Sequence, residues 1–195
     1  MIALRLRVLQ NKSMSISKTE IPSTPSLTFN YKISVVLATL LVVISIDQVT
    51  KAWAVLTFKN QAAALYFNGL FQFIYAENPG AFLGFGGEWS REVRFVIFAV
   101  LVVVGLGGML WYLLKKETSK LNLIAYSLIL AGGFGNLWDR VFHDKGQVID
   151  FMLIEIIGPL RTGVFNVADM AIVAGVLLAL FNEYYFDSRQ VKIAK

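Results

Sequence analysis

The stretch FVIFAVLVVVGLGGMLWYLL, from Phe95 to Leu114, contains 20 residues and no charged side chain. An α-helix rises about 1.5 Å per residue, so a helix of this length spans the roughly 30 Å hydrocarbon core of a bilayer. Helices on the surface of a soluble globule keep one polar face, which this stretch lacks. It therefore predicts a membrane-spanning helix and, with it, a membrane protein.

The overall composition points the same way. Hydrophobic residues make up 56% of the 195-residue chain and charged residues 16%, against about 45–50% and about 25% in soluble domains. The chain has no cysteine and one histidine, His143, which excludes disulfides, thiolate metal sites, a cysteine nucleophile and a histidine cluster. The net charge of +5 does not indicate nucleic acid, because Lys and Arg gather at the ends of the apolar runs, as they do in membrane proteins.

Three further apolar runs flank this stretch. We expect four spans at about 33–56, 93–114, 121–141 and 164–186, which give an all-α membrane domain over residues 31–190. Residues 1–30 are rich in Ser, Thr, Lys and Pro and predict a disordered cytoplasmic tail. In the outer loop, 57–92, the segment ALYFNGLFQFIYAENPGAFLGFG alternates loosely between aromatic, apolar and punctuating Gly or Asn residues, so we expect a small extracytoplasmic β-rich surface element there.

The distribution of Lys and Arg predicts the orientation. The tail, the short second connection and the C-terminus hold eleven of these residues, whereas the first and third connections with their flanks hold six. Because cytoplasmic loops carry the excess of positive charge, we expect both termini in the cytoplasm and the two longer connections outside.

Several carboxylates lie in or beside the predicted spans, where a charged group costs about 2.5–3.5 kcal/mol on insertion scales unless it is paired or functional. Asp47 and Lys51 are one helical turn apart and can pair on one face. Asp139 and Arg140 end the third span, beside a group of glycines (Gly132, Gly133 and Gly135) that permits close helix packing. A structural ion pair and a functional site are both open for these groups.

Asp150 and Asp169 stand out because the topology puts both at the outer membrane face. Asp150 lies in the apolar segment GQVIDFM, where desolvation should raise its pKa. Two carboxyl groups in a site of low dielectric tend to hold one proton between them. This is the chemistry of aspartic proteases, and it needs neither metal nor cofactor. The spacing alone equally suits a proton-relay pair in a transporter.

Five blocks, in order and spacing, resemble lipoprotein signal peptidases, the signal peptidase II family. They are DQVTK at 47–51, ENPGAFLG at 77–84, GGFGNLWDR at 132–140, QVIDF at 147–151 and VFNVADMAI at 164–172. The resemblance covers about residues 33–186. It implies an aspartyl endopeptidase of the bacterial cytoplasmic (inner) membrane that removes the signal peptide from diacylglyceryl-modified prolipoproteins, cutting before the lipidated cysteine.

The resemblance also implies roles for individual residues. It places the catalytic pair on Asp150 and Asp169. It assigns substrate binding to Asn78, Gly80, Asn136, Arg140, Asn166, Asp47 and Lys51, and structural support to Asp139. It further implies lipid-modified prolipoproteins and membrane phospholipid as partners and globomycin as an inhibitor; a monomer is the simplest expectation.

Two features depart from the family pattern. Phe82 stands in the loop block where a second small residue is usual, which changes the expected pocket shape. The stretch VFHDKGQVI, 141–149, is about two residues longer than usual, which puts the register of Asp150 in question, but the unchanged spacing from Asp150 to Asp169 indicates that the pair is kept. We expect His143 and Asp144 in this stretch to be solvated.

Two other functions were weighed. A proton-coupled carrier would favour inverted repeats or a charged path through several spans, and neither is visible in the sequence. A catalytically silent family member that only binds lipidated proteins would not need both aspartates.

Overall fold

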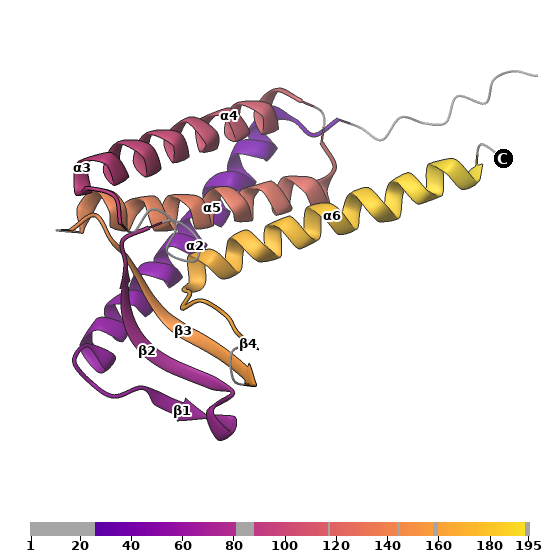
Figure 1. Ribbon diagram of the computed structural model, residues 1–195. Coiled ribbons are helices and arrows are strands. Elements are labelled where there is room, and N and C mark those ends of the chain that lie inside the picture. The colour runs from indigo at the N-terminus through magenta and orange to yellow at the C-terminus, as the bar shows by residue number, and fades with distance from the viewer. Residues whose placement is uncertain (1–25, 81–87, 117, 144, 158–159, 194–195) are drawn as a thin grey trace, which may run out of the picture.

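The computed structural model describes residues 26–80, 88–116, 118–143, 145–157 and 160–193, so most of the expected tail and Phe82 lie outside the described residues. Its long helices are α2 (Phe29–Phe58), α5 (Lys120–Phe142) and α6 (Val167–Ile193). Three consecutive segments, α3 (Arg91–Arg94), the π-helix η3 (Phe95–Val100) and α4 (Leu101–Lys115), cover the expected second span. The chain is therefore mostly helical (Figure 1).

Within the described part of the chain, three helices are long and apolar enough to cross a membrane: Phe29–Phe58, Lys120–Phe142 and Val167–Tyr185. They correspond to the expected first, third and fourth spans. The expected second span is divided, because α4 alone is a shorter apolar helix that directly follows α3 and η3. The count of four spans and their orientation stay predictions.

Two helix boundaries differ from the expected ones for local reasons. The α2 helix already begins at Phe29, because the hydroxyl of Thr28 accepts a hydrogen bond from the amide of Tyr31 (3.3 Å) and caps the first turn. The α6 helix begins only at Val167, after the expected 164, because Phe165 pairs with Met152 as an isolated β-bridge.

A four-stranded antiparallel sheet extends from one end of the helices (Figure 1). Its strands, in spatial order, are β1 (Ala64–Tyr66), β2 (Phe71–Asn78), β3 (Val148–Ile157) and β4 (Leu160–Arg161), with the 3₁₀ turn η1 (Phe67–Gly69) between β1 and β2. The outer loop thus supplies a small β element, as expected. The other two strands come from the connection after α5, where no strand was expected.

The register between β2 and β3 contains a bulge. Phe73 lies opposite Met152 and Ala76 opposite Asp150, so Ile74 and Tyr75 face one residue, Phe151. A bulge bends a strand and changes the direction of its side chains, and bulges are frequent beside active sites. Here it immediately precedes the pairing of Asp150.

Two apolar clusters hold these elements together. The first joins α2, α4 and α5 through the buried side chains of Val36, Leu106, Leu113, Leu123, Leu130 and Leu137. The second packs the sheet on the end of α2 through Ala54, Phe58, Phe151 and Met152. The ring of Trp53 packs edge to face on this cluster, with ring centroids 5.0 Å from Phe58 and 5.2 Å from Phe73, while Phe58 and Phe73 stack on each other (5.5 Å).

Lys32 joins the start of α2 to the end of α4. Its side chain is buried, and its ammonium group donates to the carbonyl oxygens of Leu113 (3.3 Å) and Lys116. These carbonyls lack helical donors and carry the partial negative charge of a helix C-terminus, so a buried lysine can satisfy them. The contact fixes the divided helical segment against α2.

The helices α5 and α6 run side by side at very close distance (Figure 1). A Cβ atom on Gly132 would lie 2.2 Å from the carbonyl oxygen of Ala168, and one on Gly175 would lie 2.5 Å from that of Ala125. This close approach confirms the packing expected for the glycines of α5. It brings the first turn of α6 directly against α5.

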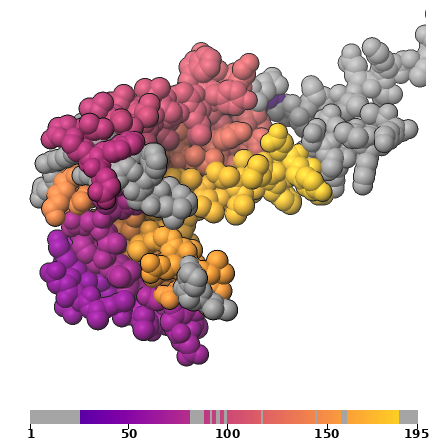
Figure 2. Space-filling view, viewed as in Figure 1, coloured from indigo at the N-terminus to yellow at the C-terminus, as the bar shows by residue number. Residues whose placement is uncertain are grey.

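The surface is notched between the length of α6 and the sheet (Figure 2). Along α6 the apolar side chains of Met170, Val173 and Leu177 are each more than half exposed. They form a stripe that starts next to Asp169, since residues three and seven positions apart share a helix face.

Candidate active site

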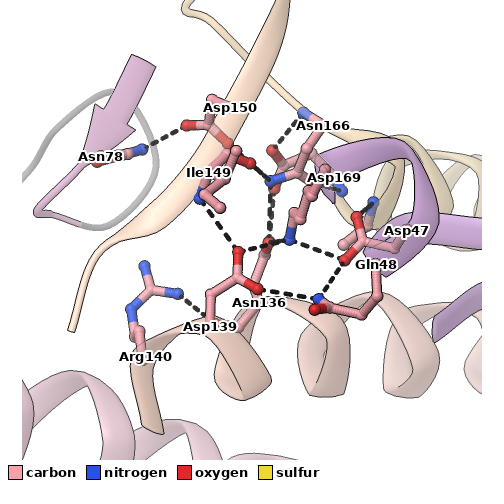
Figure 3. Close-up of polar contacts among 12 residues, drawn as sticks. Asp47, Gln48, Asn78, Asn136, Asp139, Arg140, Ile149, Asp150, Asn166 and Asp169 are labelled. Atoms are coloured by element: carbon pink, nitrogen blue, oxygen red, sulfur yellow. Dashed lines mark hydrogen bonds and ion pairs between the residues drawn. The ribbon is translucent and has the colours of Figure 1, made fainter. Parts of the chain in front are cut away.

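Five elements bring their polar side chains together where the sheet meets the helices (Figure 3). The α2 helix supplies Asp47, Gln48 and Lys51, the end of β2 supplies Asn78, α5 supplies Asn136, Asp139 and Arg140, β3 supplies Asp150, and α6 with its preceding residue supplies Asp169 and Asn166. All residues to which the resemblance gives a catalytic, binding or structural role therefore lie in one connected network. We call Asp150 and Asp169 the aspartate pair.

Asp150 is held in the β3 strand and is 2% exposed. One carboxylate oxygen, Oδ1, accepts a hydrogen bond from Asn166 Nδ2 (2.7 Å), and Oδ2 accepts one from Asn78 Nδ2 (3.0 Å). Burial raises the pKa of Asp150, and the nearby Asp169 carboxyl adds to this effect, so that the pKa is about 7. The raised pKa expected from the apolar sequence around Asp150 is confirmed.

Asp169 lies in the first turn of α6 and is half-buried. Its Oδ2 accepts from the backbone amide of Asn166 (3.1 Å), while its own amide donates to Asn166 Oδ1 (2.9 Å). This is the reciprocal arrangement of a capping box, here built from Asn and Asp. The other oxygen, Oδ1, accepts from Asn136 Nδ2 (2.8 Å).

Asn166 connects the two members of the pair. The backbone of Phe165 pairs with Met152 on β3, so the next residue emerges beside Asp150. Asn166 is 0% exposed; its side-chain oxygen binds the amide of Asp169, and its Nδ2 group donates to Asp150. A single side chain thus spans from one carboxylate to the start of the helix that carries the other.

The loop after β2 is attached to α5. Asn78 Oδ1 accepts from the amide of Gly80 (3.0 Å), which forms a tight turn across Pro79. The guanidinium of Arg140 donates to the carbonyl oxygens of Gly80 (2.8 Å) and Asn136 (3.1 Å). Arg140 therefore clamps two backbone segments at the edge of the aspartate pair.

Beneath the pair lies a buried charged group, the Lys51 cluster, which we define as Asp47, Gln48, Lys51 and Asp139. The Lys51 ammonium lies 2.8 Å from Asp47 Oδ2 and 2.9 Å from Asp139 Oδ2, and donates to Asn136 Oδ1 at 3.2 Å. Asp47 and Lys51 are 0% and 1% exposed. A substrate could contact these two groups only if such bonds opened, so the geometry favours a supporting position for them; their assignment to substrate binding stays a prediction.

The cluster also ties the surrounding backbone. Asp47 Oδ1 accepts from the amide of Ala168 (2.9 Å), at the start of α6. Asp139 Oδ2 accepts from the amide of Ile149 (3.1 Å), next to Asp150 on β3. The carboxylates of α2 and α5 therefore fix the two backbone segments that carry the aspartate pair.

A family model described as signal peptidase (SPase) II matches residues 37–185 of the chain. The chain belongs to the signal peptidase II family. The lipoprotein signal peptidase of Psychromonas ingrahamii is 37% identical to it over 159 residues, 79% of this chain and 86% of that protein. That of Clostridium novyi is 34% identical over 140 residues, 71% of this chain and 90% of that protein.

A solved structure of a membrane enzyme is similar in fold to this chain. It is described as a bacterial membrane enzyme structure obtained by the in meso method at 2.3 Å resolution, and it is 26% identical to this chain. The TM-score is 0.68 over 83% of this chain and 94% of that chain. Membership of the signal peptidase II family makes this chain an integral membrane protease.

The lengthened stretch before Asp150 does not separate it from its partners. The stretch contains a turn in which the amide of Gly146, with a φ of 62°, donates to the carbonyl of His143 (2.8 Å). Lys145 then reaches Glu77 on β2 (3.2 Å). Asp150 contacts both Asn78 and Asn166, in line with its unchanged spacing to Asp169. His143 is half-buried instead of solvated, and Asp144 lies outside the described residues.

The sequence did not single out Gln48, which supports the site from the Lys51 cluster without contacting the aspartate pair. Its Nε2 group donates to Asp139 Oδ1 (2.9 Å) and Asp47 Oδ2 (3.2 Å). Its position next to Asp47 in the block DQVTK was the available signal. Unlike a carboxylate, a neutral amide does not carry the cost of a charge in a membrane, so that cost did not mark it. Within the described residues, no group of three or more His, Cys, Asp or Glu side chains is placed to hold a metal ion.

Proposed function

We propose that the chain is an aspartyl endopeptidase that removes signal peptides from diacylglyceryl-modified prolipoproteins, cutting before the lipidated cysteine. The substrate class is suggested by the relatives, which are lipoprotein signal peptidases. The observation that carries the catalytic type is the arrangement of the pair: each of the four oxygens of Asp150 and Asp169 accepts one N–H hydrogen bond, and Asn166 contacts both residues.

The different surroundings of the two aspartates indicate different catalytic roles. Asp169 accepts from a backbone amide at a helix N-terminus, where the partial positive charge favours a carboxylate. Asp150 is almost fully buried, and its pKa of about 7 leaves it substantially protonated near neutral pH. We therefore assign the general base to Asp169 and the general acid to Asp150.

In this mechanism Asp169 takes a proton from water as the water oxygen attacks the scissile carbonyl carbon. Asp150 gives its proton to the carbonyl oxygen, so the tetrahedral intermediate is a neutral gem-diol. As the intermediate collapses, the carbon–nitrogen bond breaks, the leaving nitrogen receives the proton from Asp169, and a hydroxyl proton returns to Asp150. The four N–H groups around the pair can only donate hydrogen bonds. None of them can therefore accept the proton that the two aspartates hold.

We propose that Asn78, Gly80 and Arg140 hold the substrate backbone at the rim, with Asn136 and Asn166 orienting the pair. The acyl chains of the lipidated cysteine would lie against the exposed stripe of Met170, Val173 and Leu177, which starts next to Asp169 on α6. The chemistry would then lie where the apolar stripe meets the polar network.

We further propose four membrane spans, with α3, η3 and α4 together as the second. Both termini would face the cytoplasm and the sheet would lie at the extracytoplasmic face of the bacterial cytoplasmic membrane. The excess of Lys and Arg in the tail, the second connection and the C-terminus supports this orientation. A monomer with no cofactor is sufficient for the proposed chemistry.

The decisive experiment incubates purified protein in detergent with a lipid-modified prolipoprotein and follows release of the signal peptide. Asp169→Asn and Asp150→Asn should each abolish release while keeping the thermal unfolding transition. Glu183→Gln, which removes an exposed carboxylate elsewhere on α6, is the matched control and should cleave normally.

The same assay separates the other two readings. Turnover by Asp169→Asn or Asp150→Asn would overturn the assignment of the pair. Binding of the lipidated substrate without cleavage by the wild type would indicate a silent binding protein, and proton flux in liposomes without cleavage would indicate a carrier. Inhibition by globomycin would support the peptidase.

A further inference from the structure

The orientation of an asparagine amide decides whether it offers a donor or an acceptor, and three such amides surround the aspartate pair. Asn78 and Asn166 have their side-chain oxygens bound to the backbone amides of Gly80 and Asp169. A backbone amide only donates, so neither side chain can turn around without losing that bond. Their NH₂ groups consequently face Asp150.

Within the described part of the chain, no backbone amide donates to the side-chain oxygen of Asn136. Its Oδ1 is held instead by Lys51 Nζ (3.2 Å) and by Asn166 Nδ2 (3.0 Å). The hydrogen bond from Asn166 competes with other contacts, because Asn166 Nδ2 has only two hydrogens and also lies 2.7 Å from Asp150 Oδ1 and 3.3 Å from the carbonyl of Ile149.

Lys51, in contrast, has one hydrogen for each of its acceptors. Its ammonium carries three hydrogens and has three acceptors, one each on Asp47, Asp139 and Asn136. One hydrogen is therefore available for Asn136. Because an ammonium group cannot accept, it forces the oxygen of this amide toward itself and the NH₂ group toward Asp169 Oδ1, at 2.8 Å.

We propose that Lys51 is a positioning residue that acts on Asp169 through Asn136, by fixing which end of the amide faces the carboxylate. This inference rests on the proposed function, in which Asp169 is the general base. With the amide reversed, its oxygen would face the carboxylate, repel the charged form and favour the protonated one. The base would then require a higher pH to lose its proton.

The test must separate this effect from the loss of a charge. The charged groups around Asp169 come from three elements: Asp150 from β3, Asp139 and Arg140 from α5, and Asp47 and Lys51 from α2. Combining Lys51→Met with Asp47→Asn removes one positive and one negative charge, so the net charge of the site stays the same. A remaining shift then reports the orientation of Asn136.

We expect the acidic limb of the kcat/KM profile of Lys51→Met/Asp47→Asn to move to higher pH by about one unit, the value for losing one hydrogen bond to a charged group. Lys51→Arg keeps a group that only donates and should keep the limb in place. Gln48→Met is the matched control, because Gln48 contacts the carboxylates of Asp47 and Asp139, as Lys51 does, but not Asn136. It should lower the unfolding temperature and leave the limb unmoved.

If the limb of Lys51→Met/Asp47→Asn coincides with that of the wild type and of Gln48→Met, the inference is overturned, while cleavage by the wild type leaves the proposed function standing. Should this variant not fold, Lys51→Leu/Asp47→Asn replaces it; leucine also has no donor for Asn136, so the same upward shift is expected, and its absence counts equally against the inference. Failure of the wild type to cleave would remove the proposed function and the inference together.

Discussion

Asn166 and Asp169 cap the same helix for each other. Asn166 Oδ1 accepts from the Asp169 amide at 2.9 Å, and Asp169 Oδ2 accepts from the Asn166 amide at 3.1 Å. A residue of the proposed catalytic pair is thereby part of the N-terminal cap of α6. Its position is set by helix geometry instead of by a flexible side chain in a loop.

This relationship predicts that Asn166→Ala damages both stability and activity. Loss of the cap should lower the free energy of unfolding by about 1 kcal/mol, and loss of the donor to Asp150 should lower kcat by about 100-fold. Both are measurable in detergent, by thermal unfolding and by signal-peptide release.

Ser119→Ala is the control, because Ser119 caps α5 by accepting from the amide of Asn122 (3.1 Å). It should lower stability by a similar amount without a change in kcat. Equal losses of activity in the two variants would mean that Asn166 acts only as a cap.

The raised pKa of Asp150 predicts a pH dependence of stability with a definite sign. The folded state binds this proton more tightly than the unfolded chain, whose ordinary pKa is 3.8. The contribution to stability is therefore fully present below this value and is lost as the pH rises through about 7. Between about pH 4 and about pH 8 the loss is on the order of a few kcal/mol.

Asp150→Asn isolates this contribution. The unfolding temperature of the wild type should fall relative to that of the variant over this pH range. Glu77 works in the opposite direction, because its hydrogen bond from the Tyr75 hydroxyl lowers its pKa, but it is present in both proteins and cancels. Parallel curves for the two proteins would show that Asp150 is not protonated preferentially in the folded state.

The sequence predicted the helices better than the sheet. Long apolar runs identify α2, α5 and α6 because the bilayer imposes length and composition together. The strand β3, VIDFMLIEII, was not predicted, because its apolar residues are nearly continuous, with Phe151, Met152 and Leu153 all buried. Such a run does not separate a buried strand from the edge of a membrane helix.

The candidate site was predictable in part. The energetic cost of a charge in or beside a membrane span marks Asp47, Asp139, Asp150 and Asp169 equally. Only the resemblance distinguished the last two as the catalytic pair. The spacing of Asn166 and Asp169 is that of a capping box and could have placed the start of α6. The orientations of the amides could not be read from the sequence, because each depends on a donor that is distant along the chain, such as Lys51 for Asn136.

The close contact of α5 and α6 predicts that Gly132→Ala displaces the first turn of α6. The new Cβ would lie 2.2 Å from the carbonyl oxygen of Ala168, a backbone atom adjacent to Asp169, so the helix itself must move. We expect a loss of about 1–3 kcal/mol in stability and a fall in kcat. Gly107→Ala on α4 has no neighbour within 4 Å and should leave both unchanged. Normal cleavage by Gly132→Ala would show that the position of α6 is not critical.

The clamp formed by Arg140 predicts that even the conservative change Arg140→Lys impairs cleavage. The guanidinium reaches the carbonyls of Gly80 (2.8 Å) and Asn136 (3.1 Å) through two different nitrogens, and a lysine presents a single nitrogen that does not reproduce this fork. The loop bearing Asn78 would then lose its attachment to α5, and a displacement of about 1 Å at an active site can lower the rate by about 100-fold. Arg161→Lys, an exposed change on β4, serves as the control and should cleave at the wild-type rate. If Arg140→Lys also cleaves at that rate, positive charge alone suffices at this position and the fork geometry has no catalytic consequence.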